Sequence, residues 1–72
     1  MNVNKQLGMR VRYLREQKGM TLEELSFESN VNKNYLSDLE RGNRNPTVKL
    51  LERIALALDI SLETLFKGIR TY

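Results

Sequence analysis

The 72-residue sequence contains no cysteine, no histidine and only one proline. Without cysteine there is no disulfide, and without cysteine or histidine the zinc fingers and zinc ribbons are excluded. The absence of histidine also removes the commonest general base and the histidine-activated nucleophiles. A chain this short offers little concave surface for a substrate. We therefore expect no enzyme activity, no metal or other cofactor, and no small-molecule ligand.

The length allows one small core, because a chain of this size buries only about 60% of the surface that its unfolded form exposes. The prediction is a single domain over residues 1–72. No apolar run approaches the length of a membrane span, and residues 1–6 lack the charged-then-apolar layout of a signal peptide. These absences predict a cytoplasmic protein with no membrane partner.

Charges of both signs are present, with a modest basic excess. Twelve Lys and Arg against nine Asp and Glu give a net charge of +3 and a pI near 9.5. This balance is compatible with a polyanionic partner but is too small to establish one. The positions of the charges must therefore decide.

Apolar residues recur at helical spacing, and no segment alternates as a β-strand does, so we predict an all-α fold. The first apolar stripe consists of Leu7, Val11 and Leu14. Thr21 followed by Glu24 forms a capping box, the clearest helix start in the chain. Caps and glycine or asparagine stops delimit five expected helices, at 5–18, 22–29, 33–40, 48–58 and 62–67.

The helices expected at 22–29 and 33–40 are joined by a very short turn, which is the sequence form of a helix-turn-helix over about residues 21–41. The second helix of such a unit reads base edges in the major groove from its N-terminal turns. Its outward positions carry side chains that can donate or accept hydrogen bonds. These candidate base-contacting residues are Lys33, Asn34, Ser37 and Asp38.

Each of these side chains suits a different contact. A lysine can donate to guanine O6 and N7, an asparagine can form two hydrogen bonds with adenine, and a serine can serve either base. The carboxylate of Asp38 is repelled by phosphates unless it accepts from cytosine N4 or pairs with a neighbouring cation. Both options stay open for Asp38.

Polar and cationic residues around this helix are placed to bind phosphates on either side of the groove. We expect Lys33, Arg41 and Arg44 to be unpaired cations gathered around it. At the start of the preceding helix, the hydroxyl and backbone N–H of Thr21 have the same predicted role. For Tyr35, packing at the rim of the helix and a sugar or phosphate contact are equally open. The candidate backbone contacts are Thr21, Asn32, Tyr35, Arg41, Arg44 and Asn45.

Apolar residues near the C-terminal end exceed what one small core needs. The helical stripes turn Phe27, Leu50 and Leu56 outward. We predict a dimerisation region over about residues 56–69. Its expected interface residues are Leu56, Ile60, Leu62, Leu65, Phe66 and Ile69. The alternative is a protein-interaction module, such as an antitoxin that covers a toxin, with secondary DNA binding; Phe27 receives no assigned role.

Several motifs between Arg15 and Leu58 agree in order and spacing with one family. They are Lys18-Gly19-Met20-Thr21-Leu22-Glu23-Glu24-Leu25, Tyr35-Leu36-Ser37-Asp38-Leu39-Glu40-Arg41-Gly42, Arg44-Asn45-Pro46-Thr47 and Leu51-Glu52-Arg53-Ile54-Ala55-Leu56-Ala57-Leu58. This stretch resembles the Cro/cI (XRE) type of helix-turn-helix. The resemblance implies a five-helix, lambda-repressor-like domain that binds double-stranded DNA as a homodimer at a pseudo-palindromic operator and regulates transcription.

The resemblance also implies an ion pair, because in this family an arginine late in the first helix pairs with a glutamate late in the third. The matching residues are Arg15 and Glu40, whose role would be structural. RNA polymerase is a further candidate partner. The chain looks most like the stand-alone controller proteins of restriction–modification systems, on the absence of a sensor domain and the stretches Phe27-Glu28-Ser29-Asn30 and Asn43-Arg44-Asn45. Small phage repressors and antitoxins share most of these residues, so these identities stay open.

Overall fold

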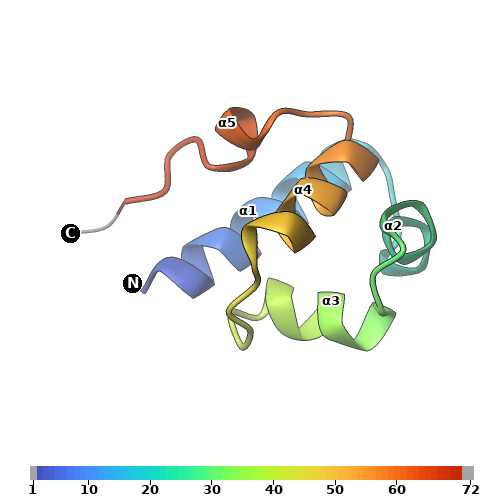
Figure 1. The fold of residues 1–72 in the computed structure, drawn as a ribbon, viewed down its shortest axis with the longest axis horizontal. Helices are drawn as coiled ribbons and strands as arrows, with labels where there is room; N and C mark the ends of the chain where they lie inside the picture. Colours follow the sequence, from blue (N-terminus) through green and yellow to red (C-terminus); the bar gives the residue numbers. More distant parts are fainter. Residues whose placement is uncertain (1, 71–72) are drawn as a thin grey trace.

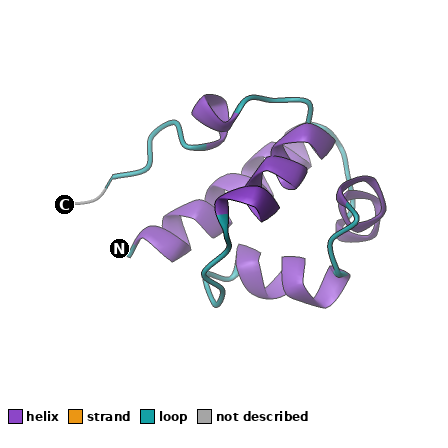
Figure 2. Ribbon diagram, viewed as in Figure 1, coloured by secondary structure: helices purple, strands orange, loops and turns teal. Residues whose placement is uncertain are grey.

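The structure, a computed structural model, describes residues 2–70. Within these residues the chain forms helices and no strand (Figures 1 and 2). The helices are α1 (Val3–Gln17), α2 (Leu22–Ser29), α3 (Lys33–Glu40), α4 (Val48–Ala57) and α5 (Leu62–Leu65). The predicted all-α fold with five helices is confirmed. None of the described helices combines the length and apolar character needed to cross a membrane.

The bounds of α2 and α3 agree with the prediction, and α4 ends one residue before the predicted position 58. Helix α1 starts at Val3 rather than at position 5, because Oδ1 of Asn2 accepts a hydrogen bond of 2.8 Å from the backbone N–H of Lys5. It ends one residue early, at Gln17. Helix α5 is shorter than predicted, since the chain leaves the helix after Leu65 and reaches a φ of 84° at Gly68.

Helix α3 lies along one side of the molecule, and α5 with the C-terminal segment lies on the opposite side (Figure 1). In this view α1 and α4 occupy the space between them, and α2 stands at one end. The described chain measures 34 × 22 × 22 Å. One long side of the molecule is therefore formed by α3 and the loop that follows it.

The core forms where the apolar stripes of all five helices converge with Val31 of the α2–α3 turn. Leu50, which was predicted to point outward, is half-buried and packs against this core, because it faces Val31 and Tyr35 at the turn. Phe27 and Leu56 are 85% and 72% exposed, as expected for outward positions. The buried core residues are Leu7, Val11, Leu25, Val31, Leu36, Leu39, Leu51, Ile54, Ala55, Leu58 and Leu65.

An ion pair between Arg15 of α1 and Glu40 of α3 joins the two helices. Nε of Arg15 donates to Oε2 of Glu40 at 2.7 Å and Nη2 donates to Oε1 at 3.1 Å, with the two side chains only 12% and 7% exposed. Nη1 donates to the carbonyl of Met20 at 2.7 Å, so the same guanidinium also holds the α1–α2 connection.

The hydrogen bond to Glu40 raises the pKa of Arg15 above its ordinary value, against the opposing effect of burial. Because the pKa in the folded state lies above that of the unfolded chain, the stabilisation by this charge is fully present at neutral pH. It is lost only as the pH rises through the raised pKa. The charge on Arg15 is therefore constant over the neutral range.

Two contacts tie α5 and the C-terminal segment to α1. Nη2 of Arg10 donates to the carbonyl of Thr64 at 2.8 Å. The side-chain amide of Gln6 donates to the carbonyl of Arg70 and accepts from its backbone N–H, both at 2.7 Å. These hydrogen bonds hold α5 and the segment that follows it against α1.

Candidate nucleic-acid interface

The turn between α2 and α3 sets the direction of α3. Asn30, which ends α2, adopts φ 56° and ψ 38°, a left-handed conformation that asparagine accepts more readily than most residues. The next residue, Val31, is buried, and its carbonyl accepts from Oγ of Ser26 at 2.6 Å. The hydrogen bond from Ser26 and the buried side chain of Val31 therefore both hold the turn in place.

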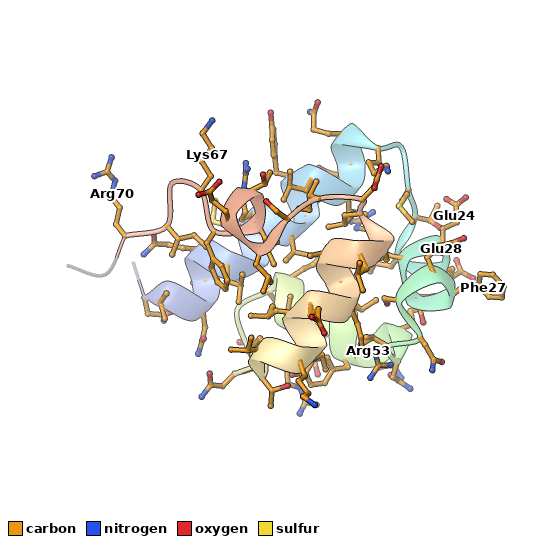
Figure 3. The ribbon with its side chains drawn as sticks, turned by 45° about the horizontal axis from the view of Figure 1, so that its top comes forward. Glu24, Phe27, Glu28, Arg53, Lys67 and Arg70 are labelled. Atoms are coloured by element: carbon orange, nitrogen blue, oxygen red, sulfur yellow. The ribbon has the colours of Figure 1, made fainter. Side chains whose placement is uncertain are left out.

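The side chain of Arg53, on α4, also contacts this turn (Figure 3). Its Nε donates to the carbonyl of Ser29 at 3.2 Å, and its Nη2 donates to the carbonyl of Asn30. These carbonyls end α2, which carries no basic residue in its own last turn, so a cation there is favourable. Sequence reasoning gives Arg53 no role, because an outward arginine on an amphipathic helix looks like any solvated charge.

The first turn of α3 is capped by Asn32 and points to solvent. Oδ1 of Asn32 accepts from the backbone N–H groups of Asn34 and Tyr35 at 2.8 and 3.1 Å, so only its amide group is left for a phosphate. Lys33 and Asn34 are exposed. Nζ of Lys33 lies 3.9 Å from Oε1 of Glu23, and both side chains are more than half exposed, so this pairing is weak.

Farther along α3, Asp38 forms ion pairs with two arginines. Its Oδ1 accepts from Nη2 of Arg41 at 2.6 Å, and its Oδ2 accepts from Nη2 of Arg44 at 3.2 Å. Nη1 of Arg41 also donates to Oγ of Ser37 at 3.0 Å. The guanidinium of Arg44 lies 5.0 Å from the centroid of the Tyr35 ring, within the range of a cation–π contact. We call Tyr35, Ser37, Asp38, Arg41 and Arg44 the Asp38 cluster.

The expectation that Lys33, Arg41 and Arg44 are unpaired is wrong, since Lys33 has a weak partner in Glu23 and both arginines pair with Asp38. Arg41 follows Asp38 at the i, i+3 spacing that brings helical side chains together, and the loop after α3 returns Arg44 to the same carboxylate. Of the two options left open for Asp38, the structure contains the pairing with neighbouring cations. Tyr35 is half-buried and packs against the core with Arg44 over its ring.

The remaining candidates for backbone contacts lie at the start of α2 and in the loop after α3. Thr21 uses its backbone N–H and its hydroxyl oxygen in a capping box with Glu24, at 2.8 and 3.0 Å. Its hydroxyl hydrogen is still available as a donor. Asn45 is exposed in the α3–α4 loop, next to Arg44. The structure thus brings Asn45 and Arg44 to the C-terminal end of α3, whereas Thr21 belongs to the first helix of the pair.

The apolar residues expected at a dimer interface divide into three groups. Leu56 and Phe66 are exposed. Leu65 is fully buried and belongs to the core, because it occupies the inward-facing position of the one-turn helix α5. It has no surface to offer to a second chain. The residues that are half-buried and pack against the core from outside are Ile60, Leu62 and Ile69.

Two short helices joined by a tight turn, the second exposing its first turn along one side of the molecule, define a helix-turn-helix protein. The family HTH_3, described as helix-turn-helix, matches residues 11–65. The chain belongs to this XRE-type family of DNA-binding transcriptional regulators.

Individual relatives agree with this assignment. The chain is 46% identical over 61 residues to the HTH-type transcriptional regulator y4dJ of Sinorhizobium fredii, a match that covers 85% of this chain and 79% of that protein. It is 40% identical over 60 residues to the HTH-type transcriptional regulator SinR of Bacillus subtilis, covering 82% of this chain and 54% of SinR. The chain thus spans about half the length of SinR.

A solved structure of a DNA complex is similar to this fold. The restriction–modification controller protein C.Esp1396I, crystallised as a tetramer with its natural 35 base-pair operator, matches with a TM-score of 0.86 and 34% identity. The match covers 93% of this chain and 88% of that one. The similarity in fold therefore extends over nearly the whole of both chains.

Proposed function

We propose that this chain is a sequence-specific transcription regulator that acts as a homodimer on a pseudo-palindromic operator, with α3 of each subunit in a major groove. The observation that carries the proposal is the first turn of α3. Lys33 and Asn34 are exposed there, while Leu36 and Leu39 on the opposite face of the helix are buried. Side chains that donate and accept at this position are what readout of base edges requires.

Contacts to the DNA backbone would hold α3 in register. The proposed groups are the side-chain amides of Asn32 and Asn45, the hydroxyl of Thr21, and the guanidinium groups of Arg41 and Arg44. Asn32 directly precedes α3, and Thr21 caps the start of α2. Arg41, Arg44 and Asn45 follow the C-terminal end of α3. Such contacts supply affinity and orientation but carry no sequence information.

Replacement of Arg44 by alanine should flatten the salt dependence of DNA binding by about one unit, since each neutralised phosphate contributes about −0.9 to the slope. The measurement is the Kd for a duplex at several salt concentrations. Arg12→Ala is the matched control, because Arg12 is an exposed, carboxylate-paired arginine on α1, outside α3 and outside the predicted dimerisation region 56–69. An unchanged slope for Arg44→Ala removes Arg44 from the phosphate contacts.

The proposed dimer contact combines exposed Leu56 and Phe66 with half-buried Ile60, Leu62 and Ile69, an apolar surface that a second copy would cover. Two-fold symmetry predicts half-sites about one helical turn, roughly 34 Å, apart or a multiple of that. Sedimentation equilibrium of the pure protein should give a dimer. A monomer contradicts this arrangement and favours the rival function, a protein-interaction module such as an antitoxin.

The similarity to C.Esp1396I supports a narrower proposal, control of restriction–modification genes. A regulator of this kind acts on cytoplasmic DNA, and RNA polymerase becomes a further partner. The neighbouring genes test this part. A methyltransferase gene and an endonuclease gene beside this one support control of restriction–modification genes. A toxin gene in that place contradicts it and supports the antitoxin hypothesis.

Selection of bound duplexes from a random pool tests sequence-specific binding itself. The expected product is a set of duplexes that share an inverted repeat with the predicted half-site spacing. Recovery of duplexes with no common motif would refute sequence-specific regulation, whatever the oligomeric state of the protein.

A further inference from the structure

The Asp38 cluster places a negative charge where DNA binding calls for positive ones. The carboxylate lies 2.6 and 3.2 Å from the nearest nitrogens of Arg41 and Arg44, so the three groups together carry one net positive charge instead of two. The Asp38 side chain is 31% exposed, and its charge therefore acts at the surface. Two arginines alone would neutralise more phosphate charge on DNA of any sequence.

The same cluster fixes the directions of both arginines. Arg41 donates from Nη1 to the hydroxyl of Ser37 and from Nη2 to the carboxylate of Asp38. Arg44 is held by the second carboxylate oxygen and lies over the ring of Tyr35. Charge-assisted hydrogen bonds of this kind orient long side chains that otherwise sample many rotamers. Both guanidinium groups are therefore arranged around one carboxylate before any DNA is bound.

We propose that Asp38 is a specificity-determining residue that acts as a charge filter, weakening binding to DNA of arbitrary sequence more than binding to the operator. This inference rests on the proposed DNA-binding function. In the operator complex, base contacts by Lys33 and Asn34 fix one register, in which the oriented arginines meet phosphates and the carboxylate stays between them. Without those base contacts no register is fixed, and repulsion between the carboxylate and phosphates opposes binding. Asp38 needs no contact with a base for this effect.

The test is Asp38→Asn, which removes the charge, keeps the shape and leaves one oxygen to accept from an arginine. Kd is measured for a random-sequence duplex and for the selected operator at several salt concentrations. The random duplex should bind on the order of threefold to tenfold more tightly near 0.1 M salt, with a slope steeper by about one unit. The operator should gain less, so the ratio of the two affinities falls.

Glu16→Gln is the matched control. It makes the same change in net charge, and Glu16 lies on α1, outside α3 and outside the predicted dimerisation region 56–69. Like Asp38, Glu16 is a carboxylate paired with an arginine, Arg12, at the surface. This variant should leave the salt slope and the affinity ratio unchanged, which separates the local effect of Asp38 from that of net charge.

Two results would overturn the filter. One is an unchanged affinity and slope on the random duplex; the other is a loss of preference at a single operator position, which would make Asp38 a reader of that base. The melting temperature of Asp38→Asn should stay near that of the wild type, because surface ion pairs contribute little to stability. A fall in the affinity ratio would then reflect the lost charge and not a loss of folded protein. If the wild type binds all duplexes equally, the proposed function fails and the charge filter fails with it, whereas the two results above overturn the charge filter alone.

Discussion

Replacement of Gly8 by alanine should destabilise the protein by about 2–4 kcal/mol, the largest effect we expect from adding a single methyl group. A Cβ atom at this position in α1 would lie 2.3 Å from the carbonyl oxygen of Leu39 and 2.7 Å from that of Glu40. Both atoms belong to the backbone of α3, so no side chain can move aside and the two helices must separate. The gain in helix propensity, about 1 kcal/mol, offsets only part of the cost.

Thermal unfolding followed by circular dichroism measures this change. For a domain of this size the loss corresponds to a fall in Tm of roughly 10–25 °C. Gly19→Ala is the matched control, because it adds the same methyl group at a φ of 68° with nothing within 4 Å. Its cost should be limited to about 1–2 kcal/mol of backbone strain. A Gly8→Ala protein as stable as the wild type contradicts the close packing of α1 on α3.

Replacement of Glu40 by glutamine should cost about 3 kcal/mol, because it leaves the guanidinium of Arg15 almost buried beside a neutral partner. The glutamine can accept through one oxygen only, whereas the carboxylate accepts from both Nε and Nη2. Arg15 also donates to the carbonyl of Met20, so its displacement loosens the α1–α2 connection as well. Urea unfolding at neutral pH, where Arg15 is fully charged, gives the change in the free energy of unfolding.

Two further variants separate the buried pair from ordinary surface charges. Arg12 and Glu16 form a pair of 3.2 Å with both side chains more than half exposed, so Glu16→Gln should change stability by less than about 1 kcal/mol. Arg15→Met combined with Glu40→Leu replaces both charges by apolar groups and should recover much of the lost stability. Equal effects of Glu40→Gln and Glu16→Gln would show that the burial of the Arg15–Glu40 pair has no energetic consequence.

The helices were predictable because their determinants are local. Caps at Thr21 and Asn32, and stops at Asn30 and Gly42, act within one turn of the chain, and α2 and α3 accordingly have the predicted bounds. The start of α1 was missed because its cap, Asn2, stands almost at the first residue of the sequence. A single serine cap predicts where α5 starts but not how soon it ends.

Contacts between segments distant in sequence were harder to predict. The pairing of Asp38 with Arg41 follows from helical spacing, but its pairing with Arg44 depends on the path of the α3–α4 loop. Gly8 did carry a signal, since a glycine inside a helix is costly and commonly marks a close approach. Sequence also could not separate Leu65, which fills the core, from Leu56, which does not. Apolar character is the same in both, and only the packed structure decides between them.

Selection from a random duplex pool with Asn34→Ala beside the wild type tests whether α3 reads bases in a symmetric dimer. Asn43→Ala, which changes an exposed asparagine in the α3–α4 loop, is the control. We expect an inverted repeat that loses base preference, by about 1–3 kcal/mol, at one position in each half-site for Asn34→Ala only. Uniform weakening at all sequences, or loss of preference in one half of the site alone, would contradict base reading by α3 in a symmetric dimer.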